Sequence, residues 1–158
     1  IARRAATGAD FEGDDAGDAG FLVMMNEIIQ TRPDVHRGWL EAELDAQLFL
    51  ADTDNANEVA KMADDQTEGM DRKILWASLY RDENRVNKLT LDFVFNDKVR
   101  NMLNASAAFL AGKKKFGKRT TLRPQAVYDE VARQVLADRG LKSPLGKIDG
   151  VPLSEYRP

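Results

Sequence analysis

The chain has 158 residues, 43% of them hydrophobic and 31% charged, which is ordinary for one globular domain with its own core. The formal net charge of −3 argues against a dedicated nucleic-acid-binding domain, because such domains are usually basic. Zero cysteines exclude disulfides and cysteine zinc sites, and a single histidine argues against the usual zinc and Ser-His-Asp chemistries.

Residues 1–20 contain few apolar side chains and many Gly and Asp residues, so we expect a loop here. The chain starts with "IARR" and has no initiator Met, so we expect a piece of a longer protein. Within the loop, "DFEGDDAGD" carries five carboxylates. The expected role of this stretch is a solvated connection in which Asp side chains accept local backbone hydrogen bonds.

A calcium site in the same loop is the alternative for this stretch. Its candidate ligands are Asp10, Glu12, Asp14 and Asp18. An EF-hand loop needs Gly at its sixth position and a bidentate Glu at its twelfth. Counting from Asp10, the sixth residue is Asp and the twelfth is Phe, so the EF-hand pattern fails.

The segment "FLVMM" at 21–25 is a continuous apolar run, which is typical of a strand buried on both faces. A long helix is predicted over 33–51, because Pro33 suits the first helical position and Asp34 suits the positive end of the helix dipole. Two apolar rows follow along this helix, so we expect it to be largely buried. They consist of Val35, Trp39, Ala42, Ala46 and Phe49, and of Leu40, Leu44 and Leu48.

Four further helices are predicted from apolar spacing, over 56–66, 71–80, 97–111 and 124–139. Asn55 and Glu58 have the spacing of a capping box for the first of these. The second is expected to direct Ile74, Leu75 and Leu79 inward, Asn96 is expected to cap the third, and Gly140 is expected to end the fourth.

Three other segments have simpler patterns. "LTLDFVF" alternates briefly and predicts a short strand or an extended segment. The stretch "KKKFGKRTTLR" at 113–123 packs six cations around one Phe, which suits either a solvated helix end or contact with an acidic surface. Residues 142–158 contain three prolines and no periodicity, so an irregular tail is expected.

No pattern for catalysis is found. His36 has no acid–base partner nearby in the sequence and is expected to be a surface or packing residue. Trp39 and Trp76 lie among aliphatic residues at helical spacing, so both are expected in the core. We expect no enzymatic activity and no cofactor.

The stretch "GFLVMMNEIIQTRPDVHRGWLEAELDAQLFLAD" resembles the C-terminal half of periplasmic substrate-binding proteins of the nitrate, sulfonate and taurine class of ABC importers. Later segments resemble the family's following helices in the same order: "NANEVAKMADDQTEG", "FVFNDKVRNMLNASAAFLAGKKKF" and "LRPQAVYDEVARQVLADRGL". The resemblance covers about residues 7 to 141 and consists of apolar spacing with a Pro start.

This resemblance implies a helix-rich α/β fold, the C-terminal part of a two-lobed, type II periplasmic-binding-protein-like architecture. Residues 1–20 would be the inter-lobe crossover, 21–141 the helix-rich C-terminal part of lobe one, and 142–158 the tail. The implied function is to capture a small oxyanionic or nitrogen-containing ligand between the lobes and deliver it to a membrane permease. A monomer outside the cytoplasm, periplasmic or membrane-anchored, is implied, and the main ligand contacts would lie upstream of Ile1.

Two alternatives to the importer function come from the residues themselves. One is an intracellular helical interaction domain that uses the basic loop 113–123. The other is a calcium-dependent binding module that uses the acidic loop 10–18.

Overall fold

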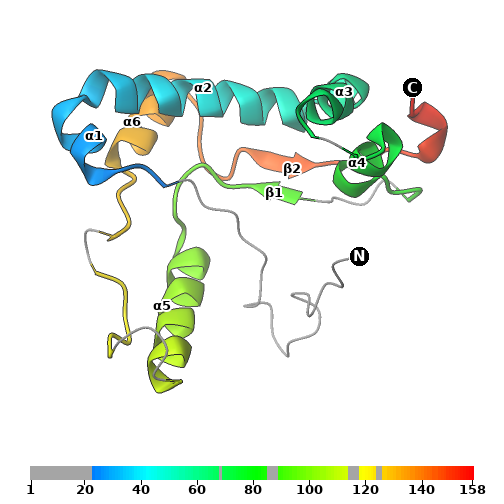
Figure 1. Ribbon diagram of the computed structural model, residues 1–158. Helices are drawn as coiled ribbons and strands as arrows, with labels where there is room; N and C mark the ends of the chain where they lie inside the picture. The colour runs from blue at the N-terminus through cyan, green and yellow to red at the C-terminus, as the bar shows by residue number, and fades with distance from the viewer. Residues whose placement is uncertain (1–22, 68, 85–88, 114–117, 124–125) are drawn as a thin grey trace. The chain divides into compact units, whose positions relative to one another are not determined.

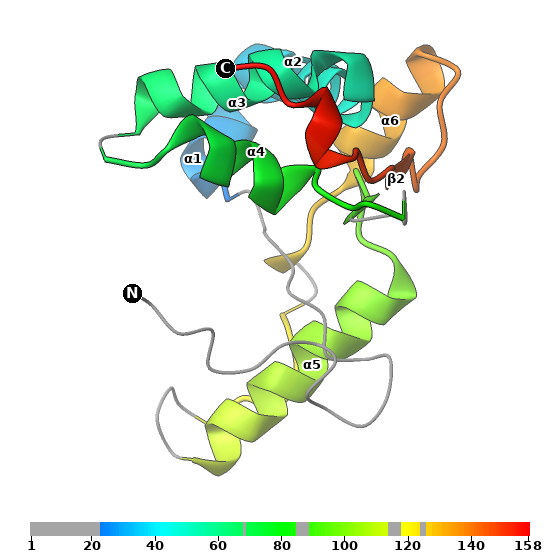
Figure 2. The ribbon, with the colours of Figure 1, turned by 90° about the vertical axis from the view of Figure 1, so that its right-hand side faces the viewer.

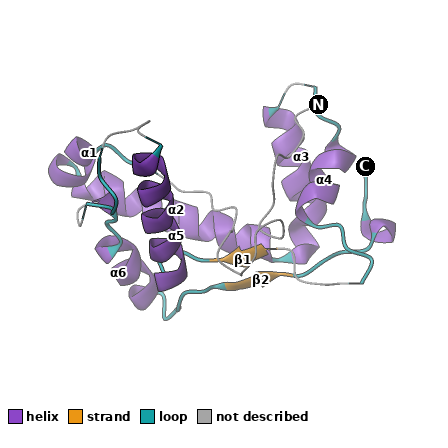
Figure 3. Ribbon diagram, turned by 90° about the horizontal axis from the view of Figure 1, so that it is seen from below, coloured by secondary structure: helices purple, strands orange, loops and turns teal. Residues whose placement is uncertain are grey.

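The computed structural model describes residues 23–67, 69–84, 89–113, 118–123 and 126–158. These described residues form two compact units, one from those of 23–31 and 95–130, and the other from those of 32–94 and 131–158. Helices dominate both units, as the colouring by secondary structure shows (Figure 3).

The second unit is organised around helix α2 (Pro33–Ala51), which begins with proline at its first turn as the sequence predicts. One row of α2 packs on helix α6 (Glu130–Asp138): Leu44, Val135 and Leu136 are buried together, with Leu40 and Leu48 beside them. Helix α6 ends at Asp138, and Gly140 follows in the turn after it with a φ of +66°. That left-handed conformation suits glycine, and the Leu141 amide closes the turn by donating to the Leu136 carbonyl at 2.9 Å.

The same unit contains a helical pair, α3 (Ala56–Gln66) and α4 (Arg72–Leu79), which pack against each other (Figure 2). Beside them lie β1 (Leu89–Leu91) and β2 (Gly146–Ile148), paired antiparallel with Thr90 opposite Lys147, and β2 contacts α2 (Figure 1). A core cluster joins α3, α4, β2 and the chain's last residues. Its buried members are Ala56, Ala60, Trp76, Tyr80, Ile148 and Val151.

Trp76 and Tyr80 anchor this cluster. Both are fully buried, and the Trp76 ring meets the Tyr156 ring edge-on at a centroid distance of 5.5 Å. The Tyr80 hydroxyl donates a hydrogen bond of 2.9 Å to the Leu50 carbonyl, at the C-terminal end of α2. Because a buried hydroxyl needs such a partner, this bond ties the α2 end to α4.

Alkaline pH is expected to weaken the second unit through Tyr80. Burial, with a smaller contribution from the Asp52 carboxylate, raises the pKa of the Tyr80 hydroxyl from 10.0 to about 12. The folded state therefore favours the neutral phenol, whose stabilising contribution is complete below pH 10 and is lost as the pH rises toward 12. Urea unfolding at stepped pH should show the free energy of unfolding falling more steeply in the native protein than in Tyr80→Phe. Equal slopes would contradict the assignment.

The first unit contains α1 (Asn26–Thr31) and α5 (Asp97–Gly112). Asn96 caps α5 as predicted, accepting a 2.9 Å hydrogen bond from the Val99 amide. The buried Asp129 carboxylate accepts bonds from the Phe95 amide at 3.2 Å and from the Arg100 guanidinium at 3.1 Å. It therefore holds the start of α5 next to the segment that precedes α6.

The predicted α/β fold, the C-terminal part of a type II two-lobed architecture, is wrong. The described residues form six α-helices and a single pair of three-residue antiparallel strands. A parallel sheet needs buried apolar strands joined by crossover helices. The described part of the predicted strand, 23–25, has no regular structure, and Val23 is 89% exposed and Met25 67% exposed.

Several local predictions need smaller corrections. Asn55 makes no capping bond, because it ends the 3-10 helix η2 (Thr53–Asn55) and its backbone is helical, with φ −85° and ψ −2°, rather than extended as at a usual N-cap. Helix α6 begins at Glu130, six residues after the predicted start at 124, and the Asp129 carboxylate just before it accepts hydrogen bonds from Phe95 and Arg100. The tail, predicted to be irregular, contributes strand β2 and the short 3-10 helix η4 (Leu153–Glu155), since both pack on the buried cluster of α4.

Candidate functional site

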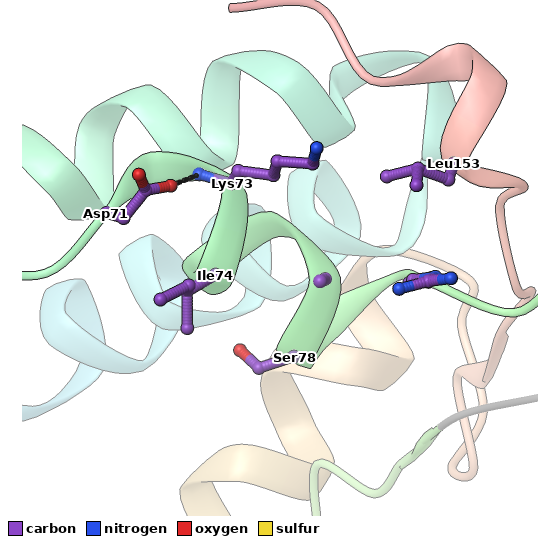
Figure 4. Close-up of a pocket in the computed structure, with 7 residues that line it drawn as sticks. Asp71, Lys73, Ile74, Ser78 and Leu153 are labelled. Atoms are coloured by element: carbon purple, nitrogen blue, oxygen red, sulfur yellow. Dashed lines mark hydrogen bonds between the residues drawn. The ribbon is translucent and has the colours of Figure 1, made fainter.

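An open groove runs along the outer face of α4 (Figure 4). The sequence positions this face locally: Asp71 caps α4, its carboxylate accepting a 2.7 Å bond from the Lys73 amide. Trp76 and Tyr80 then direct one side of the helix into the core. At 3.6 residues per turn, Ile74 and Ser78 lie on the opposite side, whereas Ala77 lies at the border and also packs against the core cluster.

The base of the groove is apolar. It is formed by Ile74 and Ala77 of α4 and by Leu153 of η4, a residue nearly 80 positions further along the chain. Ile74 is 60% exposed, which is unusual for a large aliphatic side chain on a packed helix. The C-terminal residues reach α4 through backbone bonds, because the Val151 amide donates to the Tyr80 carbonyl at 2.7 Å.

Two cations border this apolar base, at opposite ends of α4. The Lys73 side chain extends along the groove in the direction of Leu153 (Figure 4). Arg81 lies at the other end and forms an exposed ion pair with Glu83, with Nε and Oε1 3.1 Å apart. Because exposed pairs of this kind are worth about 0 to 1 kcal/mol, Arg81 can exchange Glu83 for another anion at little cost.

Two polar side chains of the groove, Ser78 and Asp71, form hydrogen bonds within α4. The Ser78 hydroxyl donates to the Leu75 carbonyl at 2.8 Å, so it is bonded to its own helix and has no general base beside it among the lining residues. The Asp71 carboxylate is engaged in capping. Among the described residues, no three His, Cys, Asp or Glu side chains are grouped so that they could hold a metal ion. The arrangement suits non-covalent binding of an anion with an apolar body.

The sequence-predicted site residues lie elsewhere. The calcium candidates Asp10, Glu12, Asp14 and Asp18 are outside the described residues, so that site stays a prediction. The basic loop 113–123 is described only at Lys113 and 118–123, and there Lys113 lies over the Phe109 ring at 5.4 Å.

The single histidine and the two tryptophans differ in how far they are buried. His36 is buried in its own unit, which agrees with a packing role. Trp76 is fully buried, as predicted, whereas Trp39 is 41% exposed, so the prediction that it is a core residue is wrong.

Sequence reasoning missed this groove because it directed Ile74 inward together with Leu75 and Leu79. The helical period of this segment does contain the information that places Ile74 on the outer side. Trp76 and Tyr80 are spaced four residues apart, so an inward face centred on them leaves Ile74 on the outer side. No local sequence pattern predicts that Leu153 lines the groove, because its position depends on how the tail packs on α4.

Comparison of the chain with family models, curated proteins and solved structures finds no match. The resemblance to importer binding proteins therefore rests on the residue pattern alone. No helix in the described part of the chain is both long enough and apolar enough to cross a membrane.

Proposed function

We propose that the protein is a non-enzymatic solute-binding protein that holds a small oxyanion with an apolar body in the groove along α4. The observation that carries this proposal is the combination of an exposed apolar base with a cation at each end of one helix. Ligand sites of this kind are concave and largely apolar, with a few polar groups that orient the ligand.

Each part of the groove has a defined task in this proposal. The apolar carbon chain of the ligand covers Ile74 and Leu153, which removes both side chains from water. The ligand's carboxylate or sulfonate contacts the Lys73 ammonium, for which no ion pair is found among the described residues. Charge-assisted hydrogen bonds of this type are stronger than neutral ones.

Delivery of the ligand to a membrane permease is also part of the proposal, and its support is the ordered resemblance of the helical segments to importer binding proteins. We also propose that the protein is a monomer located outside the cytoplasm, and the same resemblance supports both statements. Closure of two α/β lobes is not included, because the described residues have a different fold.

The groove can be tested by titrating the ¹⁵N-labelled protein with nitrate, taurine and hexanesulfonate. We expect hexanesulfonate to shift the α4 amide signals most, because it alone has both an anionic head and a long apolar body. Lys73→Glu should weaken its binding by about tenfold or more, as expected when a charged hydrogen-bond donor is replaced by a like charge.

Lys142→Glu is the matched control, because it makes the same charge change at an exposed position of the same unit outside the groove. It should leave hexanesulfonate binding within about twofold of the native protein, since exposed charges at a distance are screened by salt. Equal weakening in both variants would mean that only the net charge matters. No shift of α4 signals with any of the three anions would refute the proposed site.

A further inference from the structure

The face of α2 that points away from its core carries a complete row of apolar side chains. The row is Val35, Trp39, Ala42, Ala46 and Phe49, and every member is exposed. Val35 and Trp39 are each 41% exposed and Phe49 is 36% exposed. The core of this unit uses the other row, Leu40, Leu44 and Leu48. Helix α2 therefore has two apolar faces, and among the described residues only the face with Leu44 belongs to a buried core cluster.

The spacing of the exposed row indicates what kind of surface would cover it. Its steps alternate between four and three residues, which is the 3.5-residue repeat of a helix that packs lengthwise on another helix. An exposed apolar patch of large side chains commonly marks an interaction site. Trp39 and Phe49 are the large members, and the small Ala42 and Ala46 between them leave room for a partner helix to approach closely.

The edges of the row are acidic. On a helical wheel Asp34, Asp45 and Asp52 follow one edge at intervals of 11 and 7 residues, and Glu43 lies on the other edge. Helix α2 carries four carboxylates and one guanidinium, a formal charge of −3 with His36 neutral. Asp34 pairs with Arg32 at 3.2 Å and Asp45 with Arg139 at 2.7 Å. Both pairs are exposed, so a partner's cations can compete for these carboxylates.

The same charges argue against a second copy of this chain as the occupant. Two α2 rows packed on each other would bring acidic edges together in either orientation, and like charges across such a seam are unfavourable. A partner with Lys or Arg beside an apolar seam would instead match both the row and its edges.

We propose that the exposed row of α2 docks a basic amphipathic helix of a partner protein. Trp39 and Phe49 insert between apolar residues of that helix, as anchors spaced along one helical face do in helix recognition. Asp34, Asp45 and Glu43 contact the partner's Lys or Arg side chains along the two edges. This interaction is independent of the ligand groove, which is built on α4.

The test uses the full chain and a synthetic helical peptide of about three heptads, with Leu in its seam and Lys on both edges. The chain has two tryptophans, so its ¹⁵N spectrum contains two indole signals, which Trp39→Phe assigns. We expect the Lys peptide to shift the Trp39 indole signal and to leave the buried Trp76 signal in place. A peptide with Glu in place of Lys should bind at least about tenfold more weakly, because its edges repel those of α2.

Ala42→Arg should weaken binding of the Lys peptide by about tenfold or more, because it places a bulky cation in the middle of the row. Ala137→Arg, at an exposed position of α6 in the same unit, is the matched control and should bind normally. Circular dichroism of both variants checks that they are folded.

Four outcomes would overturn the proposal. The first two are equal binding of the Glu and Lys peptides, and no response of the Trp39 indole signal to the Lys peptide. The third is self-association of the protein that Ala42→Arg abolishes, and the fourth is shielding of the Trp39 indole from solvent in the free protein. The third would identify a second copy as the occupant, and sedimentation at several concentrations detects it. The fourth would show that this chain itself covers the row, and a soluble paramagnetic agent that broadens exposed signals detects it.

Discussion

Trp76→Ala is expected to lower the free energy of unfolding by about 3 to 5 kcal/mol, the range for truncating a large buried aromatic side chain. Trp76 is fully buried among α3, α4, β2 and the C-terminal residues, and its ring contacts Tyr156. Removing it leaves a cavity where helix, strand and tail meet. Urea denaturation followed by circular dichroism measures the change.

Trp39→Ala is the matched control, because it is the same substitution at the only other tryptophan. Its side chain is 41% exposed, so the loss should be about 1 kcal/mol or less. Trp76→Phe provides a second comparison of the free energy of unfolding. The Trp76 indole N–H has no acceptor among the described residues, so Phe removes an unsatisfied donor while keeping most of the ring volume. If Trp39→Ala proved as costly as Trp76→Ala, the assignment of the two tryptophans would be wrong.

Leu44→Ala is expected to lower the free energy of unfolding by about 2 to 5 kcal/mol. Leu44 is fully buried on the inner row of α2, against Val135 and Leu136 of α6. The substitution removes the central contact between the two helices. The measurement is again urea denaturation, read at two wavelengths so that loss of helix and loss of tertiary packing can be compared.

Leu110→Ala is the control for this second prediction, since it makes the same change on a helix surface. Leu110 lies near the end of α5 and is exposed, so a loss below about 1 kcal/mol is expected. A Leu44→Ala variant as stable as Leu110→Ala would mean that α2 and α6 are not held together by this row.

The two proposals depend on these cores in different ways. The groove requires the α4 cluster to be intact, because Leu153 lines it only when the tail is packed on Trp76 and Tyr80. The α2 row requires only that Leu44 hold the inner row against α6. Trp76→Ala should therefore disturb anion binding more than peptide binding, which keeps the two tests separable.

Helix positions were determined by the sequence itself, through local signals. The predicted spans 33–51 and 56–66 agree with α2 and α3, and Asn96 and Gly140 act at the ends of α5 and α6 as expected. Proline at a first turn, a capping amide and a glycine at a helix end act through neighbouring backbone atoms, so a few residues of sequence contain the information.

Only the tertiary structure decided which apolar face of a helix is buried. Helix α2 has two apolar rows, both at helical spacing, so no local rule selects Leu44 over Trp39 for the core. On α4, Ile74 and Trp76 are both apolar, and contacts with the C-terminal residues place Trp76 and Tyr80 in the core. The tail's own strand, β2, exists because it pairs with β1 more than 50 residues away. Burial and strand pairing depend on segments distant in sequence, and their energy comes from contacts that no single segment can make alone.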